Sequence, residues 1–345
     1  MGDKISLPLA NRQPEAPSSE RNSGPARPKL KFRPDEAGPR PDWFKRRLNL
    51  TPEFFETQEL VEEAGLNTIC ESGQCPNISE CWSRKSLTIM ILGNTCTRSC
   101  GFCDVMTGRP GRPDPDEPRR VAETLAGLGL NYCVVTSVDR DDLDDGGAGH
   151  WAETIREIKA ACPDMGLEVL TPEFKGDLDD VDTVLDAEPD CFAHNLETVE
   201  ALHREVRPQA KYQRSLDVLA HAADDGRALV KSGMMLGLGE TNEETLSTME
   251  DLVAHGVEVL NLGQYLRPSE RHLPVRRWIH PDEFDMFKRE GEAMGFKHVE
   301  AGPLVRSSYR ADLQADEIAE KDEGALGGGC GGGFANPGAE KLTER

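Results

Sequence analysis

Residues 87–103 read LTIMILGNTCTRSCGFC, an unbroken apolar run followed at once by a cysteine-rich loop. The run at 87–92 has the length and composition of a buried β-strand. The thiols of Cys96, Cys100 and Cys103 follow it with the spacing Cys-x3-Cys-x2-Cys. Parallel α/β sheets place their reactive groups in the loops at the carboxyl ends of their strands. This segment therefore predicts a parallel sheet with a site at the end of its first strand.

The same pattern of apolar run, polar loop and amphipathic stretch recurs along the chain. The predicted strands are residues 87–92, 132–138, 167–170, 191–194, 229–236 and 257–262. The predicted helices are residues 117–128, 151–161, 177–186, 213–224, 243–254 and 281–294. Six such repeats indicate a barrel or an open doubly wound sheet. Because nearly every strand is followed by unusual polar residues, we predict an α/β fold of the partial TIM-barrel type, (β/α)6, open on one side.

The chain divides into five predicted segments. Residues 1–41 are proline-rich without apolar periodicity and predict an unstructured tail. Residues 42–85 form an N-terminal extension that carries a second cysteine group, and residues 86–300 form the barrel. Residues 301–323 predict a C-terminal closing segment, and the glycine-rich residues 324–345 predict a flexible tail.

The composition limits the partners and the compartment. The formal charge of −22 over 345 residues argues against nucleic acid and anionic membranes, because both would repel this surface. The sequence has neither the start of a secretory signal nor an apolar run long enough to cross a bilayer. We therefore expect a cytoplasmic protein, in which clustered cysteines bind metals rather than form disulfides.

The Cys96, Cys100 and Cys103 loop suits three corners of a cubic [4Fe-4S] cluster. No fourth cysteine follows close by, so one iron atom would have no protein ligand and could bind a small molecule. The alternative is a structural zinc site that lacks one ligand, although such sites usually pair Cys-x2-Cys knuckles and close at four ligands.

A second triplet precedes the first strand. Cys70, Cys75 and Cys81 have the spacing Cys-x4-Cys-x5-Cys and predict a second cluster, the alternative being scattered structural thiols. The other cysteines have no cluster spacing. Cys133, Cys162 and Cys191 are expected to be inert core residues. Cys330 is expected to be an exposed, oxidisable thiol.

With these motifs the chain resembles the radical S-adenosylmethionine (SAM) superfamily and, from about residue 70 to about residue 311, the lipoyl synthases. Besides both triplets, the resemblance covers a series of short motifs in order. They are CPNI at 75–78, ECW at 80–82, TSVDRDD at 136–142, AHNLETV at 193–199, MLGLGE at 235–240, GQYL at 263–266, RHLP at 271–274 and GPLVRSSY at 302–309.

The resemblance implies two [4Fe-4S] clusters and SAM as cofactors. Cys96, Cys100 and Cys103 would hold the cluster that cleaves SAM. Cys70, Cys75 and Cys81 would hold the auxiliary cluster with Ser308, or with Ser307 as the fallback. Arg306 would contact or gate that cluster, or form a plain ion pair. Five residues are expected to contact SAM: Asp139, Asn195, Glu197, Gly237 and Glu240. The alternative is that they only pack or cap loops.

The activity implied is the insertion of two sulfur atoms, at C6 and C8, into an octanoyl chain on a lysine of a lipoyl carrier domain. The sulfur would come from the auxiliary cluster. Carbons without an acidic proton cannot be activated by acid–base groups, so a radical is required. The expected partners are the octanoylated carrier, a low-potential electron donor and an iron–sulfur delivery protein. The alternatives are another sulfur-inserting or methylthiolating radical enzyme, or a non-catalytic iron–sulfur electron carrier.

Overall fold

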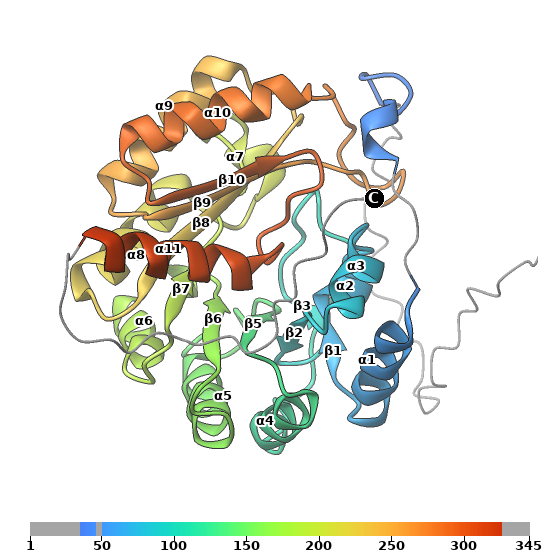
Figure 1. Ribbon diagram of the computed structural model, residues 1–345, viewed down its shortest axis with the longest axis vertical. Helices are drawn as coiled ribbons and strands as arrows, with labels where there is room; N and C mark the ends of the chain where they lie inside the picture. The colour runs from blue at the N-terminus through green and yellow to red at the C-terminus, as the bar shows by residue number, and fades with distance from the viewer. Residues whose placement is uncertain (1–34, 46–49, 326–345) are drawn as a thin grey trace, which may run out of the picture. The chain divides into compact units, whose positions relative to one another are not determined.

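The computed structural model describes residues 35–45 and 50–325 (Figure 1). Cys330, residues 1–34 of the predicted N-terminal tail and most of the predicted glycine-rich tail lie outside these ranges. None of the described helices is long and apolar enough to cross a bilayer.

The main sheet is wound like a barrel. Its strands, in spatial order, are β1 (Asn67–Thr68), β2 (Thr88–Ile91), β5 (Tyr132–Ser137), β6 (Gly166–Leu170), β7 (Cys191–Ala193), β8 (Leu229–Leu236), β9 (Val259–Gln264) and β10 (His298–Gly302). Every pairing from β2 to β10 is parallel, and only β1 is antiparallel to its neighbour. Spatial order follows chain order, which is barrel winding rather than the reversal of a doubly wound sheet. The partial barrel is therefore confirmed, with β10 as a seventh parallel strand that was not predicted.

The helices that follow the strands cover the outer face of the sheet (Figure 1). They are α4 (Glu117–Leu128), α5 (Ala148–Ala161), α6 (Leu178–Leu185), α8 (Tyr212–Asp225), α9 (Asn242–Ala254) and α10 (Pro281–Met294). Helix α7 (Glu200–Val206) instead contacts the loop with Cys100 and Cys103, through the Val206 carbonyl. Each predicted helix is present, and its apolar stripe is buried, as for Val121, Leu125 and Leu128 in α4. The outer helices and the sheet thus enclose one main hydrophobic core.

The remaining elements lie outside the repeated strand–helix pattern. They are η1 (Asp42–Phe44), α1 (Pro52–Glu63), α2 (Ile69–Ser72), α3 (Ile78–Ser83), the paired strands β3 (Thr95–Cys96) and β4 (Met106–Thr107), η2 (Phe174–Gly176) and α11 (Ala311–Ala325). Strand β1 joins the N-terminal extension to the barrel by pairing with β2. The extension is thereby fixed against the first barrel strand.

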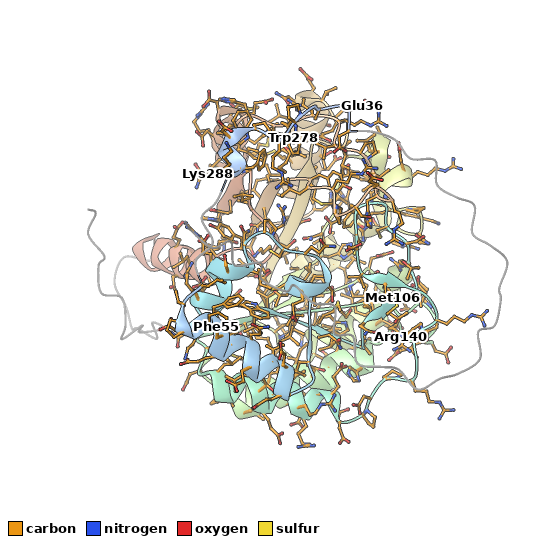
Figure 2. The ribbon with its side chains drawn as sticks, turned by 90° about the vertical axis from the view of Figure 1, so that its right-hand side faces the viewer. Glu36, Phe55, Met106, Arg140, Trp278 and Lys288 are labelled. Carbon is orange, nitrogen blue, oxygen red and sulfur yellow. The ribbon has the colours of Figure 1, made fainter. Side chains whose placement is uncertain are left out.

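Residues 35–41, which the sequence analysis assigned to the tail, contact the loop after β9. The Asp35 carboxylate accepts hydrogen bonds from the Val275 backbone N–H and from Arg267, both at 3.0 Å. The Trp278 indole N–H donates to the Gly38 carbonyl at 3.2 Å. Figure 2 labels Glu36 and Trp278 near each other at one end of the molecule. Contacts with the rest of the chain therefore begin before the predicted boundary at residue 42.

Strand β2 shows how the sheet separates the core from the barrel interior. Side chains alternate along a strand, so every second residue faces the same side. Thr88 and Met90 line a cavity inside the barrel. Ile89 and Ile91 are fully buried in the hydrophobic core. One face of the sheet thus stabilises the fold, and the other presents residues to the cavity.

Candidate active site

A cavity of about 590 Å³ lies inside the barrel, a volume typical of sites for cofactors and small substrates. Residues from the N-terminal extension, the barrel strands and the C-terminal segment line it. Five of the six predicted cluster cysteines are among them: Cys70, Cys75, Cys96, Cys100 and Cys103. The structure therefore brings members of both triplets, which are separate in sequence, to one cavity.

The loop with Cys96, Cys100 and Cys103 is held by backbone hydrogen bonds. The Gly101 N–H donates to the Val206 carbonyl, and the Leu273 N–H donates to the Gly101 carbonyl, both at 2.9 Å. Burial is the main cause that raises the pKa of all three thiols, to about 12 for Cys96 and Cys100 and about 11 for Cys103. Such thiols ionise when a metal supplies the compensating positive charge.

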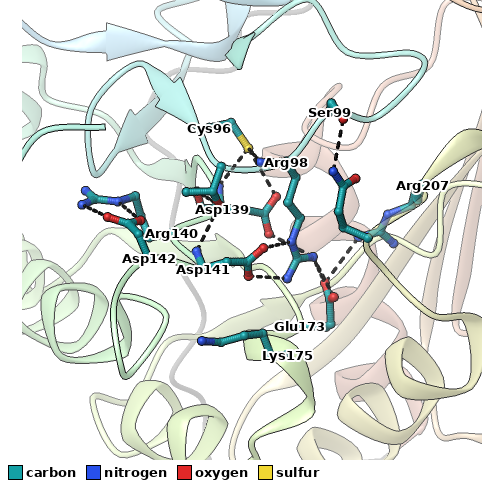
Figure 3. A network of polar contacts seen from close by, with 12 residues as sticks. Cys96, Arg98, Ser99, Asp139, Arg140, Asp141, Asp142, Glu173, Lys175 and Arg207 are labelled. Atoms are coloured by element: carbon teal, nitrogen blue, oxygen red, sulfur yellow. Dashed lines mark hydrogen bonds and ion pairs between the residues drawn. The ribbon is translucent and has the colours of Figure 1, made fainter. Parts of the chain in front are cut away.

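Arg98 ties this loop to the ends of two barrel strands (Figure 3). Its guanidinium is buried and donates to both oxygens of Asp141 at 2.7 and 2.8 Å and to both oxygens of Glu173 at 2.6 and 2.7 Å. It also forms an ion pair with Asp139 at 3.2 Å. Bidentate pairs of this kind fix orientation as well as charge. The loop is thus anchored from within, between two of its cysteines.

Glu173 is the buried centre of this network. It is fully enclosed, and Arg214 contacts it at 2.7 Å in addition to Arg98. Burial alone would raise the pKa of this carboxyl, but the positive charge of Arg98, followed by further positive groups, lowers it to about 2. Sequence reasoning assigned neither Arg98 nor Glu173 to the site, because their pairing is visible only in three dimensions.

Three predicted SAM contacts line the cavity: Asp139, Asn195 and Glu197. Asp139 lies beside the first cluster loop, since the Cys96 thiol donates to its carboxylate at 3.6 Å. The Asn195 amide donates to Glu197 at 3.0 Å and to the Ser307 hydroxyl at 2.6 Å. Burial raises the pKa of both carboxyls. These residues therefore lie between the first cysteine triplet and the C-terminal segment.

Gly237 and Glu240 are not among the residues that line the cavity. The Glu240 carboxylate instead accepts the backbone N–H groups of Gly237, Leu238 and Gly239. Gly237 has a φ of 99°, and a Cβ there would lie 2.4 Å from the Arg277 carbonyl oxygen. The structure thus shows both residues shaping the turn after β8, and their predicted contact with SAM stays a prediction.

The second triplet lies in and between α2 and α3. Burial is the largest cause that raises the pKa of Cys70 to about 11 and of Cys81 to about 12, and the charge of Cys75 is the next. The thiols therefore lie close enough to repel one another when ionised. Cys81, in α3, is not among the residues that line the cavity.

The C-terminal segment reaches the same region. Ser308 accepts a hydrogen bond from the Thr88 hydroxyl at 2.7 Å, and both residues line the cavity. Ser307 faces the barrel, where its hydroxyl accepts from Asn195 and its carbonyl from Asn261. The Arg306 guanidinium donates to the carbonyls of Gln264 and Val305. The two serines are therefore held by different parts of the chain.

Side chains in α3 and at its two ends bind this C-terminal segment. The Asn77 amide donates to the Leu304 carbonyl at 2.7 Å, and the Tyr309 hydroxyl donates to Glu80 at 3.1 Å. Arg84 forms an ion pair with Asp312 at 2.9 Å. The sequence holds no local signal for these contacts, because each joins residues more than 220 positions apart.

The donor set fits iron–sulfur clusters better than a single ion. In the described part of the chain, no three His, Cys, Asp or Glu side chains converge on one metal-ion position, as a zinc site would require. In a cubic cluster each thiolate binds a different iron atom, so its ligands surround a volume rather than a point. The other cysteines of the described residues, Cys133, Cys162 and Cys191, are not among the residues that line the cavity.

Comparison with known proteins agrees with this site. The sequence profile of the Radical SAM superfamily matches residues 90–252. The lipoyl synthase of Rubrobacter xylanophilus is 53% identical over 84% of this chain and 90% of the relative. That of Thermus thermophilus is 54% identical, with 79% and 85% covered, and that of Leptothrix cholodnii is 48% identical, with 88% and 92% covered. Because such identity extends over nearly the whole length of these relatives, the chain belongs to the lipoyl synthase family.

Proposed function

We propose that this chain inserts two sulfur atoms, at C6 and C8, into an octanoyl chain carried on a lysine of a lipoyl carrier domain. The observation that carries the proposal is that one cavity is lined by all three cysteines of the first triplet and by Cys70 and Cys75 of the second. When bound, SAM and the two clusters supply the carbon-centred radical chemistry and the sulfur. Membership of the lipoyl synthase family supports the same assignment.

Each triplet has a separate task in this proposal. Cys96, Cys100 and Cys103 would hold one cluster with an open iron position, and Asp139, Asn195 and Glu197 line the cavity where SAM would bind. The cavity lies inside the barrel, and a bound substrate would help to keep water from a reactive carbon there.

Cys70, Cys75, Cys81 and Ser308 would hold the auxiliary cluster. A hydroxyl oxygen is a harder ligand than a thiolate and binds iron less firmly, so this corner would open first. The Arg306 guanidinium lines the same cavity as Cys75 and Ser308. It would contact the serine-bound corner.

The partners follow from this chemistry. An octanoylated carrier domain would present its chain to the cavity, and a low-potential electron donor would reduce the first cluster. Because the auxiliary cluster is consumed, an iron–sulfur delivery protein would rebuild it. We place the reaction in the cytoplasm, where exposed cluster thiols stay reduced.

The test supplies reduced, cluster-loaded protein with SAM and an octanoyl-lysine peptide, and measures the peptide by mass. We expect the mass of two added sulfur atoms. Cys70→Ala should abolish sulfur addition while 5′-deoxyadenosine still forms, and Cys96→Ala should abolish both. Cys162→Ala, at the end of α5 and outside the cavity, is the matched control. Formation of 5′-deoxyadenosine without sulfur gain by the unmodified protein would reject the proposal.

A further inference from the structure

Thr88 stands between the two chain segments that would hold the auxiliary cluster. It is the first residue of β2, is 2% exposed and lines the cavity. Its hydroxyl donates to the Ser308 oxygen at 2.7 Å across 220 positions of sequence. Thr88 thus contacts one proposed ligand, Ser308, and shares the cavity with two others, Cys70 and Cys75 of the N-terminal extension.

The backbone of Thr88 is fixed, whereas that of Ser308 is not part of a sheet. Strand β2 pairs with β1 on one side and with β5 on the other, and Thr88 itself is opposite Val134. Ser308 lies in a turn before α11. The position of the Thr88 hydroxyl is therefore set by the barrel, and the serine oxygen aligns with it.

The direction of this hydrogen bond matters for a metal ligand. A serine oxygen that coordinates iron carries negative charge and can only accept hydrogen bonds. A hydroxyl that donates to such an oxygen forms a charge-assisted bond, which is stronger than a neutral one. Groups that orient metal ligands in this way change metal affinity about 10–100-fold. Valine at position 88 would keep the shape and remove this donor.

We propose that Thr88 is a positioning residue of the auxiliary cluster, which holds the Ser308 oxygen toward the Cys70 triplet and sets how fast that corner opens. This inference rests on the proposed role of Ser308 as a ligand. Thr88, a strand residue outside both cysteine motifs, would then control how long the auxiliary cluster persists as the source of sulfur.

The experiment measures the rate at which a chelator removes iron from the auxiliary cluster alone, in full-length protein carrying Cys96→Ala, Cys100→Ala and Cys103→Ala. Thr88→Val should lose iron about tenfold faster than its parent. Thr88→Ser, which keeps the hydroxyl, should restore the slow rate. Thr154→Val is the matched control, because Thr154 is fully buried in α5 and bonds only within its own helix.

Ser308→Ala separates this inference from the assignment beneath it. If Thr88 acts through Ser308, iron release should be fast in Ser308→Ala and no faster after Thr88→Val is added. If Ser308→Ala releases iron fast and Thr88→Val releases it at the parent rate, the role of Thr88 is overturned and the serine ligand stands. An unchanged rate in Ser308→Ala would overturn the assignment of the serine ligand and the inference with it.

Discussion

The Arg98 guanidinium is a buried positive charge that pairs with Asp141 and Glu173 beside the first cysteine loop. Removing one partner of a buried ion pair leaves an uncompensated charge and is strongly destabilising. We expect Arg98→Met to lower the free energy of unfolding of the cluster-free protein by about 3 kcal/mol, measured by urea denaturation.

A double-mutant cycle with Glu173→Gln tests the cause. In the double mutant, Glu173→Gln should recover a large part of the lost free energy of unfolding. Residue 173 then no longer carries a buried charge that lacks its main partner, Arg98. Strictly additive losses would contradict the proposed pairing.

Two buried imidazoles should make the fold sensitive to mild acid. Burial, followed by the charge of Arg207, lowers the pKa of His194 and of His203 to about 4, from 6.5. Between these pH values the unfolded chain binds more protons than the folded one, so stability is complete above pH 6.5 and falls as the pH drops. From pH 7 to 5 the free energy of unfolding should fall by about 2 kcal/mol for each histidine. His194→Gln should flatten this dependence, and an unchanged slope would refute the role of burial.

The sequence predicted the cluster thiols of the site but not the residues that position them. Cysteine spacing points directly to cluster chemistry, because chance seldom produces two close triplets. Thr88 carries no such signal, since threonine is common in strands for its shape alone. The partners of Arg98 lie 43 and 75 positions away, and only the folded chain brings them together.

At the scale of elements, the turn between β8 and α9 depends on glycine. Gly237 combines a φ of 99° with no space for a Cβ, because the Gln264 amide nitrogen would lie within 2.1 Å. We expect Gly237→Ala to destabilise the cluster-free protein by more than about 2 kcal/mol in urea denaturation. Gly129→Ala, at the end of α4 with φ 61° and open space around it, should cost about 1 kcal/mol. Equal losses of unfolding free energy in the two variants would show that the lack of space at Gly237 does not decide the destabilisation.

The helices were predictable because their local signals agree with the fold. Helix α9 begins with a complete capping box at Thr241 and Glu244, and α10 begins at a proline. Strand β10 has no comparable signal, because only valine in its sequence HVEAG favours a strand. It forms by pairing with β9 from Val259 to Gly263, a long-range contact that local patterns do not contain.

At the scale of the whole molecule, the N-terminal extension and the C-terminal segment close on each other over the barrel. If Cys70, Cys75, Cys81 and Ser308 share one cluster, loading it should fix residues 303–310. We expect slower amide hydrogen exchange there after cluster loading, with little change in α5. Ser308→Ala should remove most of this protection. The same protection in both proteins would contradict a serine ligand.

The central claim is that the two clusters do different work and that the auxiliary one is the source of sulfur. Its most direct test loads the protein with clusters made from a heavy sulfur isotope and follows one turnover by mass spectrometry of the octanoyl-lysine peptide. We predict that both inserted sulfur atoms carry the heavy isotope, and that Cys70→Ala yields none. Product with sulfur of natural abundance would contradict the account.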